Sequence, residues 1–507
     1  MSNNHLYINY AAALIQETYN LKSISDIDSK FMKEQIKVGL EHFRISPLEL
    51  VERKEKIRYG FSKIEKGDVV KGIFLAPNVI STDMLAKNIW KVANDYLKKI
   101  DDTSLNLKKA EKVTMAISPL VGEFLSFTQK GGISRGAPKE SLFNIALSII
   151  TTLTPYKPCM QNMGKNTAII PDLPLSDMVD FIRFFKDMLS HKSSNDLFVG
   201  KVKPIPGNKK NPSITYKPLR PLLFSGNFPN PPKSTALGGI ALLATIGEFA
   251  KETEYSKRAK SVLESLKDTS IYLIKYGDAK SFTYNHYIIE LAKNGNLRQI
   301  VDSIYYSKLY NQPEHARFDY KNTDYHKFDL LSSRFLQLFS NSAFKDFLAF
   351  RAEYPYQLEL LFNTYFIKME KIDSKIVNSA RQLGKWLNQV AYFAAKAEVK
   401  EGSPNYREKL REQKAKVLIE LESTAFSAKS GDALMAQVIT RAGRLSLMDV
   451  PSEADLFIES SMNGTLSLEQ SKNLIIAFSR LKSKYEKTED NSKEEIEPEN
   501  KFNYQDL

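Results

Sequence analysis

Residues 374–399 read SKIVNSARQLGKWLNQVAYFAAKAEV, and their helical periodicity decides the fold of the C-terminal third. Periodic stretches of the same kind follow at 406–424, 432–447, 452–462 and 467–485. Short segments with glycine or proline separate them, which are common helix-ending signals. Because short connections make neighbouring helices antiparallel, this region is predicted to form an antiparallel helical bundle.

The sequence before the bundle mixes helical and strand patterns. Residues 6–19, 141–153 and 175–189 place apolar side chains at helical spacing. The runs 68–75 and 167–170 are rich in β-branched and apolar residues and are typical of strands. The fold class predicted is α+β, with a mixed α/β N-terminal body followed by the helical bundle. Further helices are predicted at 82–100, 234–250, 330–352 and 357–366, and a further strand at 113–117.

The chain of 507 residues is predicted to divide into a large body at 1–365, a bundle at 366–485 and a disordered tail at 486–507. It carries 72 Lys and Arg against 59 Asp and Glu, a net charge of +13. The tail holds eight acidic residues and three lysines, so 69 basic and 51 acidic residues remain outside it, a net +18. An excess of this size indicates an anionic partner, nucleic acid first.

Several classes of function lack their sequence signals. The single cysteine, Cys159, excludes intramolecular disulfides and Cys-based zinc or iron–sulfur sites. The chain has no phosphate-binding loop of the Walker type, no dinucleotide fingerprint and no H-x-x-x-H spacing. We therefore expect no catalytic residue, no metal, no cofactor and no enzymatic activity. No stretch reaches the ~20 apolar residues of a membrane span, and no secretory signal starts the chain, so we expect a cytoplasmic protein.

A glycine-rich loop at 129–139 is the first candidate binding element. Its three glycines allow close approach of the backbone to a surface, and its three basic residues have no acid among them. Such a loop suits a DNA groove, although it is equally typical of a flexible connection before the next helix. The candidate contacts here are Gln129, Lys130, Gly131, Gly132, Arg135 and Lys139.

The segment 197–247 holds seven basic residues and no acidic residue. Eight prolines between Pro204 and Pro232 predict loops and edge strands. Basic residues interleaved with aromatics suit phosphate neutralisation and base stacking, and amides can contact base edges. The alternative is a proline-stiffened arm whose lysines only keep it soluble. The candidates are Asn227, Asn230 and Lys233 for base contact, and Lys209, Lys210, Lys217 and Arg220 for the backbone.

The bundle carries the third basic region. Five basic residues fall within 407–416, and two more lie at i and i+3 on the next helix. Such a face suits sequence-independent contact with a single strand, although charged helix faces are often only solvated. The candidates are Arg407, Arg411, Lys414, Arg441 and Arg444. The nearby aromatics are predicted to belong to the core, namely Trp386, Tyr392, Phe393, Phe426, Phe457 and Phe478.

Four stretches give the chain its resemblance to a known family. They are FDLLSSRFLQ at 328–337, FLAFRAEYP at 347–355, QLGKWL at 382–387 and GNFPNPP at 226–232. Together with the closing bundle they resemble the large subunit of type I CRISPR Cascade effector complexes, and subtype I-B most of all. The resemblance is one of pattern over most of the chain.

The resemblance implies a non-catalytic subunit of an RNA-guided antiviral complex. Its body would read the protospacer-adjacent motif (PAM) on double-stranded DNA and help to open the duplex for crRNA pairing. Its bundle would follow the displaced single strand, and the complex would recruit a separate helicase-nuclease. The implied partners are crRNA, backbone subunits, the crRNA 5′-handle-binding subunit and small subunits. Gln129–Lys139 and Asn227–Lys233 would then be the PAM candidates. In some subtypes a small subunit starts inside the large-subunit gene, and Met369 is the corresponding candidate start here.

Three other readings fit parts of the sequence. A general nucleic-acid-binding adaptor of replication or transposition would share the charge and the bundle without needing a guide RNA. A hydrolase could assemble its site from scattered carboxylates. A scaffold could bind proteins alone.

Overall fold

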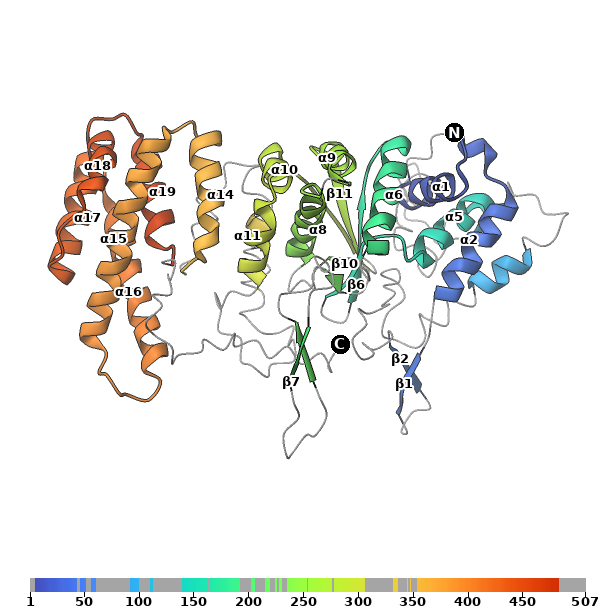
Figure 1. Cartoon of the computed structure of the whole chain (residues 1–507), viewed down its shortest axis with the longest axis horizontal. Coiled ribbons are helices and arrows are strands. Elements are labelled where there is room, and N and C mark those ends of the chain that lie inside the picture. The colour runs from blue at the N-terminus through green and yellow to red at the C-terminus, as the bar shows by residue number, and fades with distance from the viewer. Residues whose placement is uncertain are drawn as a thin grey trace. The chain divides into compact units, whose positions relative to one another are not determined.

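The computed structural model resolves the chain into two compact units, one up to Arg298 and one from Gln299 (Figure 1). This division lies upstream of the domain boundary predicted at 365/366, which remains a prediction. The residues that the structure describes are 5–42, 46–51, 56–60, 92–99, 110–112, 139–162, 165–191, 202–205, 215–218, 224–225, 228–229, 235–252, 254–275, 278–305, 332–335, 344, 347 and 353–482.

The first unit contains a four-stranded antiparallel sheet. Its order is β12 (Asp278–Thr283), β11 (Ser270–Lys275), β6 (Lys165–Pro171) and β5 (Cys159–Asn162). The two halves of the sheet come from segments about a hundred residues apart in the chain. Ile169, Ile170, Ile271 and Ile274 are buried in its two central strands. Burial of this β-branched row is the main stabilising contribution of the sheet.

Helices cover this sheet and build the rest of the first unit. Helix α1 (Leu6–Tyr19) packs against α5 (Leu142–Leu153) and α6 (Leu175–His191), and α2 (Ser29–His42) packs against α5. Helix α8 (Thr235–Phe249) packs against α9 (Ser256–Ser265) and α10 (His286–Lys293). Residues 92–99 are also helical, and η1 (Ile24–Asp26) is a 3₁₀ turn. The division between the two units falls within α11 (Asn296–Tyr305).

Among the described residues, the first unit also contains four two-stranded ribbons, and two of them hold the predicted contacts Lys139 and Lys217. They pair β1 (Ser46–Val51) with β2 (Lys56–Gly60), β3 (Ala110–Lys112) with β4 (Lys139–Ser141), β7 (Val202–Ile205) with β8 (Thr215–Pro218), and β9 (Phe224–Ser225) with β10 (Phe228–Pro229). Each is antiparallel.

The second unit is a helical bundle around α15 (Ser374–Glu398). Helices α16 (Tyr406–Ser427), α17 (Gly431–Ser446), α18 (Asp455–Met462) and α19 (Leu468–Ser479) all contact α15. The 3₁₀ turn η4 (Ser452–Ala454) precedes α18. Side-chain caps start the helices: Asp373 accepts from the Lys375 amide at 2.7 Å, and Ser467 forms a capping box with Gln470.

A segment before α15 closes one side of this bundle. It runs through η2 (Tyr356–Leu358), α14 (Glu359–Asn363) and a π-helix, η3 (Thr364–Met369). Tyr354 forms a parallel bridge with Leu481, and its amide donates to the Arg480 carbonyl at 2.8 Å. The Phe362 and Phe366 rings lie 6.1 and 5.9 Å from the Phe478 ring, centroid to centroid. The bundle core therefore includes residues that precede α15.

The predicted fold class is confirmed, since a mixed α/β body precedes a helical bundle. The helices predicted at 6–19, 141–153, 175–189, 234–250 and 374–399 are present as α1, α5, α6, α8 and α15. The helix predicted at 357–366 is broken into three helix types, because its aromatic side chains pack against Phe344 and Phe478 rather than along one face. The strands predicted at 68–75 and 113–117 lie outside the described residues, as do most of the helices predicted at 82–100 and 330–352. Strands β5, β11 and β12 are present in the structure and were not predicted from the sequence.

Leu447 ends α17 in a strained conformation. Its φ is +54°, in the left-handed region, and it is 92% exposed. A residue with a Cβ is disfavoured there by about 1 kcal/mol, and glycine is not. We expect Leu447→Gly to raise the free energy of unfolding by about 1 kcal/mol, measured by urea denaturation. Leu447→Ala is the control, because it keeps the Cβ; an equal gain from alanine would show that strain is not the cause.

Within the described residues, no helix is long and apolar enough to cross a membrane.

Candidate nucleic-acid interface

Helices α16 and α17 present the basic region of the bundle. Helix α16 buries Val417, Leu418 and Leu421, and packs against α15. Helix α17 begins after Ser430, whose hydroxyl accepts from the Ala433 amide at 3.2 Å. Apolar residues of each helix therefore pack into the core, and most charged residues lie outside, whereas Glu422 is buried and Lys414 largely buried.

One group of exposed cations lies on the sides of α16 and α17 that meet. Lys409 and Lys416 are seven residues apart on α16, and Glu420 is one turn further on, so the three share a side of the helix. Glu420 pairs with Arg441 of α17, which places that side next to α17. Arg444 lies one turn beyond Arg441. We call Lys409, Lys416 and Arg444 the basic seam.

The seam residues have no ion-pair partner among the residues that the structure describes. All three are exposed, and none of them forms an ion pair within the described part of the chain; the same holds for exposed Arg411. Uncompensated surface cations along a helix edge suit contact with a phosphate backbone, which places charges at regular intervals. A single strand needs no more than this to bind without sequence preference.

Two of the predicted contacts are already engaged within the protein. Lys414 is largely buried, pairs with Glu353 and donates to the Asn388 Oδ1 atom at 2.8 Å. Arg441 pairs with Glu420. Lys414 is therefore engaged inside the bundle, whereas Arg441 pairs at the surface and stays exposed, as do Arg411 and Arg444. Arg407 is exposed and also makes a contact within the chain.

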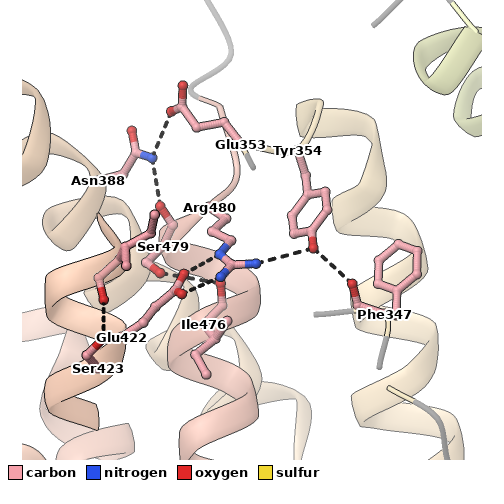
Figure 2. Close-up of polar contacts among 10 residues, drawn as sticks. Phe347, Glu353, Tyr354, Asn388, Glu422, Ser423, Ile476, Ser479 and Arg480 are labelled. Atoms are coloured by element: carbon pink, nitrogen blue, oxygen red, sulfur yellow. Dashed lines mark hydrogen bonds and ion pairs between the residues drawn. The ribbon is translucent and has the colours of Figure 1, made fainter. Parts of the chain in front are cut away.

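A buried ion pair holds the bundle behind the seam (Figure 2). The Arg480 guanidinium donates through two nitrogens to the Glu422 carboxylate, and both side chains are at most 5% exposed. A third nitrogen of Arg480 faces the Tyr354 hydroxyl at 3.5 Å, and that hydroxyl donates to the Phe347 carbonyl at 3.1 Å. Burial raises the pKa of Tyr354 to about 12, although the Arg480 charge opposes the rise. The network fixes α16 against α19.

Among the PAM candidates, only Lys139 lies in the described part of the chain. It is exposed at the start of β4, directly opposite exposed Lys112 of β3. Like charges at opposite positions of a ribbon repel, and an anion between them removes the repulsion. The candidates outside the described residues are Gln129, Lys130, Gly131, Gly132, Arg135, Asn227, Asn230 and Lys233.

Among the backbone candidates of segment 197–247, only Lys217 is described. It lies in β8, where the strand register pairs it with Lys203 of β7. A short ribbon thus brings two basic residues to one register position. Lys209, Lys210 and Arg220 lie outside the described residues.

The structure places three of the predicted core aromatics at the surface. Trp386, Phe457 and Phe478 are buried as predicted. Tyr392 is 38% exposed, and Phe393 and Phe426 are each 50% exposed, so the core assignment was wrong for these three. The sequence held a signal for Tyr392, because it shares one helix edge with Lys385, Gln389 and Lys396 at spacings of four and three. Phe393 stands at the same kinds of spacing from Gln389 and Lys396, four and three residues, so the sequence held that signal for it as well.

Among the described residues, no group of three or more His, Cys, Asp and Glu is placed to hold a metal ion. Cys159 is buried, and burial raises the pKa of its thiol to about 11. Nearby Lys157 is fully buried, donates to the Thr152 and Thr154 carbonyls, and has its pKa lowered to about 8 by burial.

Comparison with known proteins gives one match. The sequence model of the family described as CRISPR-associated protein Csp2 covers residues 5–482. No curated protein and no solved structure matches the chain. The family match supports the identification as a type I CRISPR-associated protein that the sequence motifs suggested. Because it spans nearly the whole chain, the protein belongs to the CRISPR-associated protein Csp2 family.

Proposed function

We propose that this protein is the non-catalytic large subunit of a subtype I-B Cascade surveillance complex. Its body recognises the PAM on double-stranded DNA and helps to open the duplex for crRNA pairing. Its bundle guides the displaced strand, and the assembled complex recruits a separate helicase-nuclease. The complex acts in the cytoplasm, with backbone, crRNA 5′-handle-binding and small subunits as partners.

The basic seam is the observation that carries this proposal. Lys409, Lys416 and Arg444 are exposed and lack acidic partners among the described residues, on a bundle that is itself held rigid by the Arg480–Glu422 pair. Fixed, uncompensated cations release condensed counterions when they meet a phosphate backbone, and this release favours binding at low salt. A rigid track of this kind orders a flexible strand without reading its sequence.

The PAM-reading part of the proposal is supported by the ribbons of the first unit. Lys139 and Lys112 face each other on exposed positions, and Lys217 is in register with Lys203. Guide pairing supplies most of the sequence specificity in RNA-guided complexes, so the protein needs only a short base contact and backbone neutralisation. The family to which the chain belongs makes such a complex the natural setting.

Neutralising the seam tests the proposal. We expect Lys409→Gln, Lys416→Gln and Arg444→Gln together to weaken binding of single-stranded DNA by the assembled complex. With about 0.7 counterions released per phosphate contact, the slope of log affinity against log salt should become shallower by about 2. The measurement is fluorescence anisotropy of a labelled oligonucleotide across a salt series.

A matched control removes the same charge elsewhere. Lys251, Lys267 and Lys293 pair with Glu248, Glu264 and Glu290 in the first unit, and their triple glutamine variant changes net charge equally. The control should keep the wild-type slope. An equal loss in both variants, or none in the seam variant, would refute the strand-guiding role.

The alternative of a general adaptor differs in its need for guide RNA. Duplex binding that is as tight for the isolated chain as for the crRNA-loaded complex would favour an adaptor of replication or transposition. Cleavage of DNA by the isolated chain with magnesium or manganese would instead identify a hydrolase.

A further inference from the structure

The α15–α16 hairpin extends beyond the other helices of the bundle. In Figure 1 these two helices continue past the ends of α17 and α19 and join through the turn at 399–405. Tyr392 and Phe393 lie in the last two turns of α15, before the turn that leads to α16. Their ring centroids are 5.5 Å apart with planes at 74°. We call Tyr392 and Phe393 the aromatic tip.

The aromatic tip continues two different faces of α15. Phe393 lies seven residues after Trp386, on the face that is buried along the bundle; Trp386 is 3% exposed and Phe393 is 50% exposed. The face of α15 that is buried along the bundle is therefore partly exposed to solvent near the end of the helix. Tyr392 lies on the outer polar edge, between Gln389 and Lys396. Together they leave two adjacent rings with open surface.

The α15–α16 hairpin that carries the aromatic tip also carries basic residues. The Lys396 ammonium pairs with the Glu401 carboxylate at 3.2 Å, and the pKa of Lys396 is raised by its hydrogen bond and charge interaction with Glu401, with smaller contributions from Tyr406 and Tyr392. Tyr392 lies one turn before Lys396 on α15. Lys400 lies in the turn after α15, and Arg411 lies on α16. Both are exposed, and neither forms an ion pair with any described residue.

We propose that the aromatic tip stacks against a base of the displaced single-stranded DNA, while Lys400 and Arg411 neutralise the adjoining phosphates. The proposal rests on the strand-guiding function and adds a site of different chemistry to it. Aromatic rings interleaved with cations are how proteins hold single strands without sequence preference, since every base offers a π-face. An apolar protein partner would not need the cations beside the rings, and an acidic partner would not need the rings.

The site makes a prediction distinct from that of the basic seam. Stacking involves no counterion release, so its loss lowers affinity at every salt concentration without changing the salt slope. We expect Tyr392→Leu with Phe393→Leu to weaken binding of a 20-nucleotide oligothymidine by the crRNA-loaded complex by about tenfold. Leucine keeps the apolar character of the tip and removes only the π-faces.

The experiment uses anisotropy for affinity and 2-aminopurine in the oligonucleotide for stacking. Stacking quenches 2-aminopurine fluorescence, so the variant should lose quenching that the wild-type complex produces. Phe426→Leu is the matched control, because Phe426 is also 50% exposed, at the far end of α16. Tyr392→Leu alone serves as a second variant, since the Tyr392 edge is not part of the core.

The outcomes separate this site from the function on which it rests. A tenfold loss of affinity together with a loss of 2-aminopurine quenching, with the slope of log affinity against log salt unchanged, supports stacking at the tip. Wild-type affinity and quenching in the tip variants overturn it, even where the seam variant still lowers the slope. Loss of a protein subunit from the complex with unchanged oligonucleotide binding also overturns it, and assigns the tip to a protein partner.

Discussion

Arg480→Met is expected to lower the free energy of unfolding of the bundle by about 3–5 kcal/mol, because it leaves the Glu422 carboxylate buried without its partner. The pair lies between α16 and α19, and the same guanidinium faces Tyr354 from the segment that precedes α15. One substitution therefore affects three parts of the unit. Burial alone would lower the pKa of Arg480, but the hydrogen bonds and charge of Glu422 raise it above its usual value.

The measurement is urea unfolding of the full chain, with hydrogen exchange of α16 and α19 to assign the transition to the bundle. The control is Arg480→Met combined with Glu422→Leu, which removes both charges and should recover most of the lost stability. If the single variant proves as stable as the double, the ion pair contributes nothing to the fold.

Gly384→Ala is expected to destabilise the bundle by about 1–3 kcal/mol, although alanine forms helix better than glycine. A Cβ at this position of α15 would lie 2.4 Å from the Phe478 Cβ and 2.6 Å from the Phe478 carbonyl carbon. Because one of these neighbours is backbone, α19 has to move away from α15. The packing of α15 against α19 would then open around Phe478.

Gly443 offers the matched control for this substitution. It lies inside α17, and a Cβ there would meet no heavy atom within 4 Å. Gly443→Ala should therefore stabilise the chain by about 0.5–1 kcal/mol through helix propensity alone. Thermal unfolding of the two variants gives opposite shifts in Tm if close packing at Gly384 decides the effect, and shifts of the same sign if it does not.

Local signals in the sequence predicted most of the bundle. Helix α15 starts at the predicted residue, where Asp373 caps it, and α17 starts within one residue of its prediction, after Ser430. Each of these starts depends on a cap and a periodic apolar face within a few residues. The basic face of α16 was predicted because five basic residues cluster there with few acids between them, and the structure leaves all but Lys414 exposed.

The features that the sequence did not predict depend on distant partners. Strand β11 pairs with β6 across about a hundred residues, and Arg480 is 58 residues from Glu422. Lys414 was predicted to contact nucleic acid, and only the fold brings Glu353 to it. Phe393 was predicted to be in the core, and the fold leaves it 50% exposed. Strand pairing, ion pairing and side-chain exposure thus depend on the tertiary structure, whereas the position of a helix depends on residues close to it in the sequence.

The bridge between Tyr354 and Leu481 also limits how the gene can be divided. A polypeptide translated from Met369 would contain α15 to α19 but would lack Tyr354, Phe362 and Phe366. The Phe478 ring would lose two aromatic neighbours, and the Arg480–Glu422 pair would be opened to solvent on one side. An internal start codon that preserves the bundle therefore belongs upstream of Phe344, whose ring stacks on Tyr365 at 4.1 Å. A product that begins later needs a neighbouring chain to cover what the missing residues leave open.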